Sequence, residues 1–191
     1  MYKMITFYFA ALFLVACGNP DSGTSTVVEV GQFNGAEFGY MDKGSLSNDG
    51  ASITGSGTIL FRSPIPEKDN NYALNFALQT NGSATLLVGS TVKMTGAVSL
   101  KFLRKADDTL GVTLASGSEF YDLSEDFSAI SASGPLSLEV DVHEHGHIVL
   151  WVNSEEFEYA FTQKSKGQYW GLTLGSAQLT KAAIGKPKKP H

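Results

Sequence analysis

The clearest pattern in the chain is a period-two alternation of hydrophobic and polar residues, and it is strongest over Pro135–Asn153. Two alternating runs there flank a short polar turn. In an extended chain every second side chain points to the same face, so each run predicts a β-strand with one buried face. The turn ends at Gly146, and glycine accepts the left-handed conformation that a three-residue hairpin loop needs. The sequence therefore predicts a β-hairpin in which His143 pairs with His147.

This register gives the hairpin two unlike faces. One face is aliphatic, since it pairs Val142 with Ile148, Val140 with Leu150, and Leu138 with Val152. The other face carries Glu139, Asp141, His143, His147, Val149 and Trp151. We expect the aliphatic face to pack on a core and the second face to hold most of the groups that could bind a ligand.

Similar short runs fill the rest of the chain, separated by Gly, Ser and Asn. Their spacing of roughly 8–12 residues is typical of β-sandwiches and barrels. The pair Asn81-Gly82, between the runs Tyr72–Leu78 and Ala84–Val88, predicts a tight hairpin turn. Further runs are Thr58–Arg62, Val98–Leu103, Leu110–Leu114, Phe157–Phe161 and Trp170–Leu174. We expect about ten to twelve strands in one domain, with Asp122–Ile130 and Gly175–Ile184 as the only segments open to a helical interpretation.

The N-terminus predicts export. Lys3 precedes an apolar run, Met4–Ala16, that is shorter than the ~20 residues needed to span a bilayer and fits a secretory signal. Leu14-Val15-Ala16-Cys17 resembles the lipobox of bacterial lipoproteins, in which cleavage falls just before the cysteine and the cysteine is acylated. The resemblance implies lipidation of Cys17, a membrane anchor through its acyl chains, and, because Gly18-Asn19 follows, an outer-membrane location.

These features divide the chain into a signal peptide (1–16), a lipidated cysteine with a polar tether (17–27), a β-sandwich domain (28–184) and a basic tail (185–191) that we expect to be disordered. Cys17 is the only cysteine, so no disulfide can form within the chain and the core alone must stabilise the fold. The net charge of −5 argues against a nucleic-acid partner. No phosphate-binding or dinucleotide motif is present, and we expect no cofactor.

An early FNGAEFGY, the SLEVDVHEHGHIVLWVN hairpin and a closing WGLTLGSAQLTKAAIG together resemble the concanavalin A-like (laminin G-like) jelly roll. The resemblance covers roughly residues 28–184 and implies two facing antiparallel sheets, one of them concave. We therefore predict an all-β, two-sheet antiparallel sandwich of jelly-roll type. The sequence has no clear calcium-site signature, so the family's metal is not carried over.

The same hairpin offers a catalytic alternative. Its Glu139-Val140-Asp141-Val142-His143-Glu144 resembles the Glu-x-Asp-x-x-Glu motif of laminarinase-type β-glucanases. The resemblance implies Glu139 as nucleophile, Asp141 as its assistant and Glu144 as acid/base. Retaining chemistry needs two carboxyl groups about 5–5.5 Å apart. The sequence departs from the motif at His143, where the family has an apolar residue, and Glu144 falls in the predicted turn.

Two non-catalytic sites remain on the hairpin. Trp151 lies opposite Glu139 and beside Asp141, and an aromatic ring flanked by carboxylates suits a sugar, unless other strands cover the face or the register slips. His143, His145 and His147 could share a zinc, nickel or copper ion, but no further ligand is evident and we predict no metal.

We predict a non-catalytic, lectin-like binding lipoprotein that recognises a glycan or a protein at the cell envelope. The alternatives are a glycoside hydrolase of laminarinase type and a structural envelope lipoprotein with a protein partner.

Overall fold

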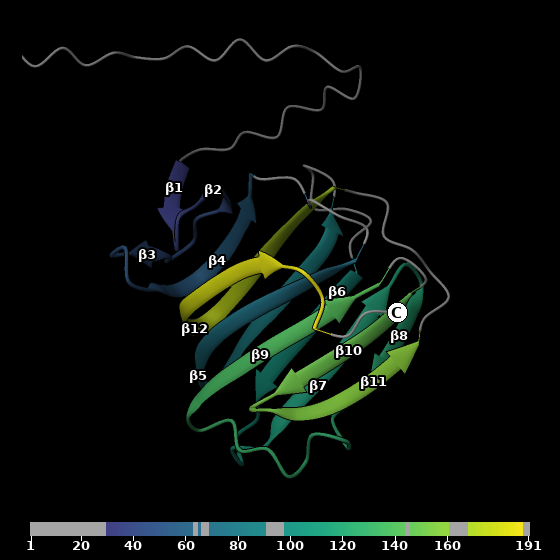
Figure 1. The fold of residues 1–191 in the computed structure, drawn as a ribbon. Helices are drawn as coiled ribbons and strands as arrows, with labels where there is room; N and C mark the ends of the chain where they lie inside the picture. The colour runs from purple at the N-terminus through teal and green to yellow at the C-terminus, as the bar shows by residue number, and fades with distance from the viewer. Residues whose placement is uncertain are drawn as a thin grey trace, which may run out of the picture.

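The computed structural model describes residues 30–62, 65, 69–90, 98–143, 146–160 and 168–188, and within these ranges all regular structure is β (Figure 1). The strands are β1 (Val30–Phe33), β2 (Ala36–Asp42), β3 (Ser47–Asn48), β4 (Ile53–Phe61), β5 (Asn70–Ser90), β6 (Val98–Arg104), β7 (Leu110–Ser116), β8 (Glu119–Asp122), β9 (Pro135–Val142), β10 (His147–Val152), β11 (Glu155–Ala160) and β12 (Tyr169–Gly185). Every pairing between them is antiparallel. In these ranges there is no helix with the length and hydropathy required to cross a bilayer. The prediction of an all-β antiparallel fold is confirmed.

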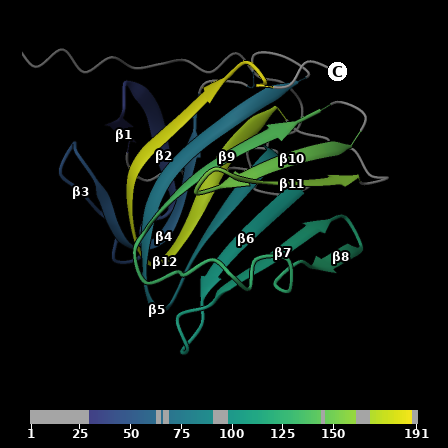
Figure 2. The same ribbon diagram turned by 60° about the horizontal axis from the view of Figure 1, so that its bottom comes forward.

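The strands form two layers that face each other (Figure 2). The front layer contains β9, β10 and β11 and continues through residues 70–78 of β5 and 177–185 of β12. The back layer contains β6, β7 and β8, continues through residues 83–90 of β5 and 169–175 of β12, and ends with residues 57–61 of β4 and with β2 and β1. The long strands β5 and β12 therefore run through both layers and connect them, and β4 follows β12 across the bend, where its residues 53–55 pair with residues 177–179.

The bend in β5 corrects one prediction from the sequence. Asn81-Gly82 does not form a hairpin turn, because β5 is a single strand of 21 residues that passes through it. The pairing with β12 shifts between Gly175 and Ala177, so residues 79–82 bulge opposite Ser176. Asn81 and Ser176 both take positive φ angles, 60° and 51°. The Asn-Gly pair thus bends the strand from one layer to the other instead of reversing it.

The hydrophobic core fills the space between the layers, as the alternation predicts. Trp170 of β12 stacks on Phe61 of β4 with ring centroids 3.9 Å apart and lies 5.5 Å from the ring of Tyr72. The segment 123–134 closes one end of the sandwich with turns, not a helix, and its Phe127 is fully buried against Phe157. Gly175–Ile184, the other ambiguous segment, belongs to β12.

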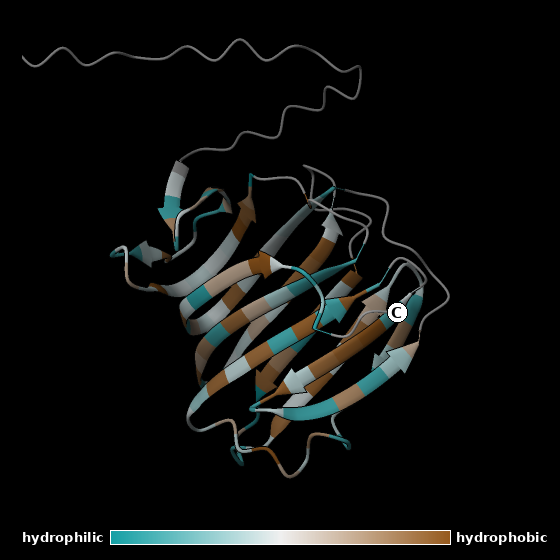
Figure 3. Ribbon diagram, viewed as in Figure 1, coloured by the Kyte–Doolittle hydropathy of each residue, from teal (hydrophilic) through white to brown (hydrophobic). Residues whose placement is uncertain are grey.

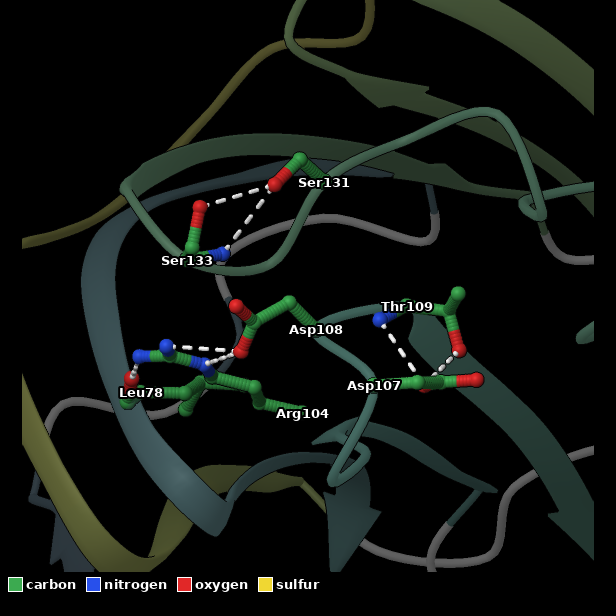
Figure 4. A network of polar contacts seen from close by, with 7 residues as sticks. All are labelled: Leu78, Arg104, Asp107, Asp108, Thr109, Ser131 and Ser133. Carbon is green, nitrogen blue, oxygen red and sulfur yellow. Dashed lines mark hydrogen bonds and ion pairs between the residues drawn. The ribbon is translucent and has the colours of Figure 1, made fainter.

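Arg104 connects the β6–β7 turn to the bend in β5 (Figure 4). Its Nε donates to Asp108 at 2.8 Å and a terminal nitrogen donates to the carbonyl of Leu78 at 3.0 Å. The carbonyl of Asp108 accepts the Ala132 N–H at 2.9 Å, which joins the end segment to the same turn. These contacts fix the β6–β7 hairpin relative to both layers.

Candidate ligand-binding surfaces

The β9–β10 hairpin has the predicted register. Val142 pairs with Ile148, and Glu139 pairs with Trp151. The His143 N–H donates to the His147 carbonyl at 2.9 Å, and Gly146 has a φ of 83°. Figure 3 shows hydrophobic and hydrophilic positions alternating along β9. Glu139, Asp141 and Trp151 therefore share the outer face of the front layer.

Asp141 is the most deeply buried of these three groups, with 0% of its surface exposed. Its Oδ1 accepts a hydrogen bond from the Asn71 side chain at 2.8 Å, and its Oδ2 accepts the backbone N–H of Lys188 at 2.8 Å. Both carboxylate oxygens are thus engaged within the protein. Asp141 is positioned to anchor the C-terminal segment rather than to meet a ligand.

Trp151 and Glu139 lie under the side chain of Lys188, a residue of the segment we expected to be a disordered tail. The Lys188 Nζ is 2.6 Å from Glu139 Oε2 and 5.1 Å from the centre of the Trp151 ring. On the other side, the Trp151 indole N–H donates to Glu156 of β11 at 3.0 Å. Trp151 and Glu139 thus lie side by side, as the predicted register requires, and the Lys188 ammonium of the chain's own C-terminal segment lies close to both. Glu156 was not predicted as part of this surface.

The catalytic alternative gains no geometric support from the described residues. Glu144, its acid/base, lies outside them, so the separation of the two carboxyl groups is not defined. Glu139 forms an ion pair with Lys188, and Asp141 is buried. The assignment stays a sequence-based alternative.

The histidines lie at the turn end of the hairpin. The rings of His143 and His147 stack at 5.5 Å, His147 Nε2 lies 2.6 Å from Glu158 Oε1, and buried His143 lies 3.8 Å from Asp69. His145 is outside the described residues. Among the residues that are described, no three His, Cys, Asp or Glu side chains are arranged to hold a metal ion.

A second surface, missed in the sequence, lies on the outer face of the back layer. Phe120 of the edge strand β8 is 67% exposed. It pairs with Ala115 of β7, whose side chain points away from the core, so the Phe120 ring also points outward. Beside it runs a polar row of directly paired residues, one each from β4, β12, β5, β6, β7 and β8: Thr58, Thr173, Thr85, Lys101, Thr113 and Asp122. We call Phe120 together with this row the Phe120 face.

The charges of the Phe120 face are accessible. Lys101 and Asp122 are both exposed, and the threonines are half-buried. Hydrogen bonds from the side chain and then the backbone N–H of Ser124 hold the pKa of Asp122 below its ordinary value, so it is a charged acceptor at neutral pH. The face thus combines an exposed ring with hydroxyl groups, one cation and one anion.

The signal that marks this face in the sequence is Glu119-Phe120-Tyr121-Asp122, two aromatic residues between two carboxylates. Tyr121 pairs with the core residue Leu114, so its ring lies on the opposite side of the strand from Phe120, where it is 38% exposed. Partial desolvation and then the Glu119 carboxylate raise the pKa of Tyr121. Alternation alone does not tell which of two adjacent aromatic residues lies on the outer face of a sheet, so these four residues do not by themselves predict a binding surface.

No protein-family model matches this sequence, and no curated protein matches it. Its fold, however, is similar to solved structures. The carbohydrate-binding module CBM66 from Bacillus subtilis matches with a TM-score of 0.62 at 11% identity, over 81% of this chain and 99% of that one. The exoplasmic/lumenal domain of VIP36, in a Ca2+/Man-bound form, matches with a TM-score of 0.55 at 14% identity, over 78% and 83%. A native glycosidic hydrolase matches with a TM-score of 0.51 at 8% identity, over 74% and 82%.

At these identities the likeness concerns the fold. The described chain is a concanavalin A-like jelly roll, which confirms the predicted fold class. Proteins that share this fold include both a binding module and a hydrolase, so the fold alone does not separate binding from catalysis. The function has to be argued from the surfaces.

Proposed function

We propose that this protein is a non-catalytic, lectin-like module that binds a glycan on the Phe120 face. The observation that carries the proposal is the 67% exposure of Phe120 on a sheet face that otherwise presents hydroxyl and charged groups. A large apolar ring exposed to water is a recurrent mark of a binding surface when polar groups surround it. The carbohydrate-binding module and the Man-bound domain among structures of the same fold support the choice of a glycan.

The chemistry of this face suits a sugar. The Phe120 ring can cover the apolar C–H face of a pyranose, while Thr113 and Asp122 offer hydroxyl and carboxylate partners in the adjacent row. The rigidity of neighbouring strands holds these groups in fixed register, which lowers the ordering cost of binding. Burying a phenylalanine side chain contributes about 1.5–3 kcal/mol, so Phe120 would supply a large share of a modest glycan affinity.

The test is glycan-array screening followed by affinity electrophoresis with the full-length protein and two variants. Phe120→Ala is expected to weaken binding at least about tenfold, because 1.4 kcal/mol corresponds to a factor of ten. It should leave the melting temperature unchanged, since the ring is 67% exposed. Trp151→Ala is the matched control and should keep the wild-type glycan affinity, because Trp151 lies on the other layer.

Two outcomes would remove the proposal. One is a wild-type protein that retains no glycan across the array. The other is a Phe120→Ala variant with wild-type affinity, which would move the site elsewhere. A stable envelope protein recovered in place of a glycan, and lost in Phe120→Ala, would favour the structural-lipoprotein alternative for the same face.

We further propose that acyl chains on Cys17 anchor the module to the outer membrane. The support is the run Leu14-Val15-Ala16-Cys17 at the end of an apolar segment. Residues 17–27 would then separate the binding domain from the lipid surface as a polar tether.

A further inference from the structure

The C-terminal segment places a lysine on an aromatic and acidic surface of the front layer. Lys188 Nζ lies 2.6 Å from Glu139 and 5.1 Å from the centre of the Trp151 ring. The indole N–H of Trp151 donates to the Glu156 carboxylate at 3.0 Å, and this hydrogen bond fixes the orientation of the ring. We call Trp151, Glu139 and Glu156 the ammonium platform, because the electron-rich face of an indole and a carboxylate are the two groups that attract a primary ammonium.

The protein also recognises the backbone of the same residue. The N–H of Lys188 donates to Oδ2 of Asp141 at 2.8 Å, and that carboxylate is fully buried. The Asn71 side chain donates a hydrogen bond to the other oxygen of Asp141 at 2.8 Å, and this contact positions the carboxylate independently of the C-terminal segment. Residues of β9 and β10 thus bind both the backbone N–H and the side-chain ammonium of one lysine.

The two contacts differ in their surroundings. The backbone contact is partly buried and its acceptor, Asp141, is fully buried, whereas the side chain of Lys188 is 48% exposed and that of Glu139 is 31% exposed. An exposed ion pair is weak and exchanges readily with solvent. The ammonium position can therefore open without unfolding of the sandwich.

We propose that the ammonium platform, together with Asp141, is a binding site for a lysine residue in an extended peptide, and that Lys188 is its intramolecular occupant. A lysine-bearing segment of a partner protein competes with Lys188 for the same position. Because the tail is tethered, it competes at a high effective concentration, and the partner binds strongly only when Lys188 is withdrawn. The site is independent of the Phe120 face and of the glycan proposal.

The test uses the full-length protein and the probe acetyl-Pro-Lys-Lys-amide, which copies residues 187–189. Binding is followed by the fluorescence of Trp151. The second tryptophan, Trp170, is 1% exposed and stacked on Phe61, so it should not respond. Lys188→Pro removes both the ammonium and the backbone N–H that Asp141 accepts. This variant should bind the probe at least about tenfold more tightly than the wild type does, because both competing contacts are gone.

Three controls decide the outcome. Lys181→Ala, which removes another exposed lysine of β12, should bind the probe as weakly as the wild type does. Adding Glu139→Gln to Lys188→Pro should cancel the gain, and acetyl-Pro-Gln-Gln-amide should not bind. The proposal is overturned if Lys188→Pro shows no gain, or if the glutamine probe binds as well as the lysine probe.

A glucosamine oligosaccharide is the remaining probe, since it carries primary ammonium groups without a peptide. If it binds Lys188→Pro as tightly as the lysine peptide does, the assignment to a peptide is wrong and the site recognises the ammonium group alone. Weaker binding of the sugar supports the role of Asp141 in reading the peptide N–H. Neither result depends on Phe120, so failure here is distinguishable from failure of the glycan proposal.

Discussion

Two carboxylates on β9, two residues apart and on the same face, have opposite environments. Glu139 is partly exposed and forms an ion pair, whereas Asp141 is fully buried between Asn71 and the backbone of Lys188. A buried carboxylate is tolerated only when its hydrogen-bonding capacity is satisfied. The difference arises from the C-terminal segment, which covers one of the two residues more completely than the other.

This difference predicts unequal effects on stability. Asp141→Ala should lower the free energy of unfolding by about 2–4 kcal/mol, because it leaves the Asn71 side chain and the Lys188 N–H without their acceptor. Glu139→Ala should cost less than about 1 kcal/mol, as exposed ion pairs do. Urea unfolding of both variants measures the contrast, and equal losses would show that Asp141 is not the anchor of the segment.

At the residue scale the sequence predicted the facing pairs of the hairpin but not their exposure. Alternation assigns a side chain to a face, and the pairing of Glu139 with Trp151 was predicted correctly. The alternation carries no information on the C-terminal segment, whose Lys188 lies 47 positions after Asp141 and folds back onto that face. Phe120 was missed for a related reason, because β8 has only four residues and its alternation is too short to read.

At the scale of elements, the bend shared by β5 and β12 determines how the layers join. Gly82 lies in the bulge, where a Cβ atom would come within 2.5 Å of the Ser176 carbonyl oxygen and 2.8 Å of the Gln79 carbonyl oxygen. Both are backbone atoms and cannot rotate away. The close approach of the two strands therefore requires glycine at this position.

Gly82→Ala should destabilise the protein by about 1–3 kcal/mol, because the backbone of one long strand must shift. In thermal unfolding this corresponds to a fall of roughly 2–4 °C per kcal/mol for a chain of this size. Gly134→Ala is the matched control, since its Cβ would meet nothing within 4 Å, and it should change stability by no more than about 0.5 kcal/mol. Similar melting temperatures for the two variants would contradict the close packing at the bend.

The hairpin prediction at Asn81-Gly82 failed because local turn chemistry was overridden by tertiary pairing. The dipeptide does supply the positive φ that a tight turn needs, at Asn81. The two halves of β5, however, both pair with the same long strand, β12, and this pairing holds them as one continuous strand. A local pattern cannot show that one distant strand serves as partner to both runs.

At the scale of the whole molecule, the sequence predicted two facing layers around one core, because period-two runs with one buried face have few other ways to exclude water. The sequence could not predict that β5 and β12 continue through both layers. Two separate short strands and one long bent strand show the same alternation of hydrophobic and polar residues. The interior between the layers is built from aromatic and aliphatic residues of both.

Lipid anchoring is the prediction that belongs to this scale. When the full chain is produced in a bacterium, we expect it in the membrane fraction, labelled by fatty acid and starting at Cys17. Each buried CH₂ contributes about 0.8 kcal/mol, so two or more chains hold the protein on the membrane. Cys17→Ser should abolish both labelling and membrane recovery. Intact-mass measurement of a wild-type protein with an unmodified thiol would refute the anchor.

The position of β12 has a consequence for how the chain is made. This strand lies between β4 and β5 and contributes to both layers, yet it is the last strand in chain order among the residues described. Until it leaves the ribosome, its two neighbours present backbone N–H and C=O groups with no strand between them. Closure of the sandwich therefore follows the synthesis of the other described strands, and until β12 is available a chaperone would meet these strands as an open polypeptide.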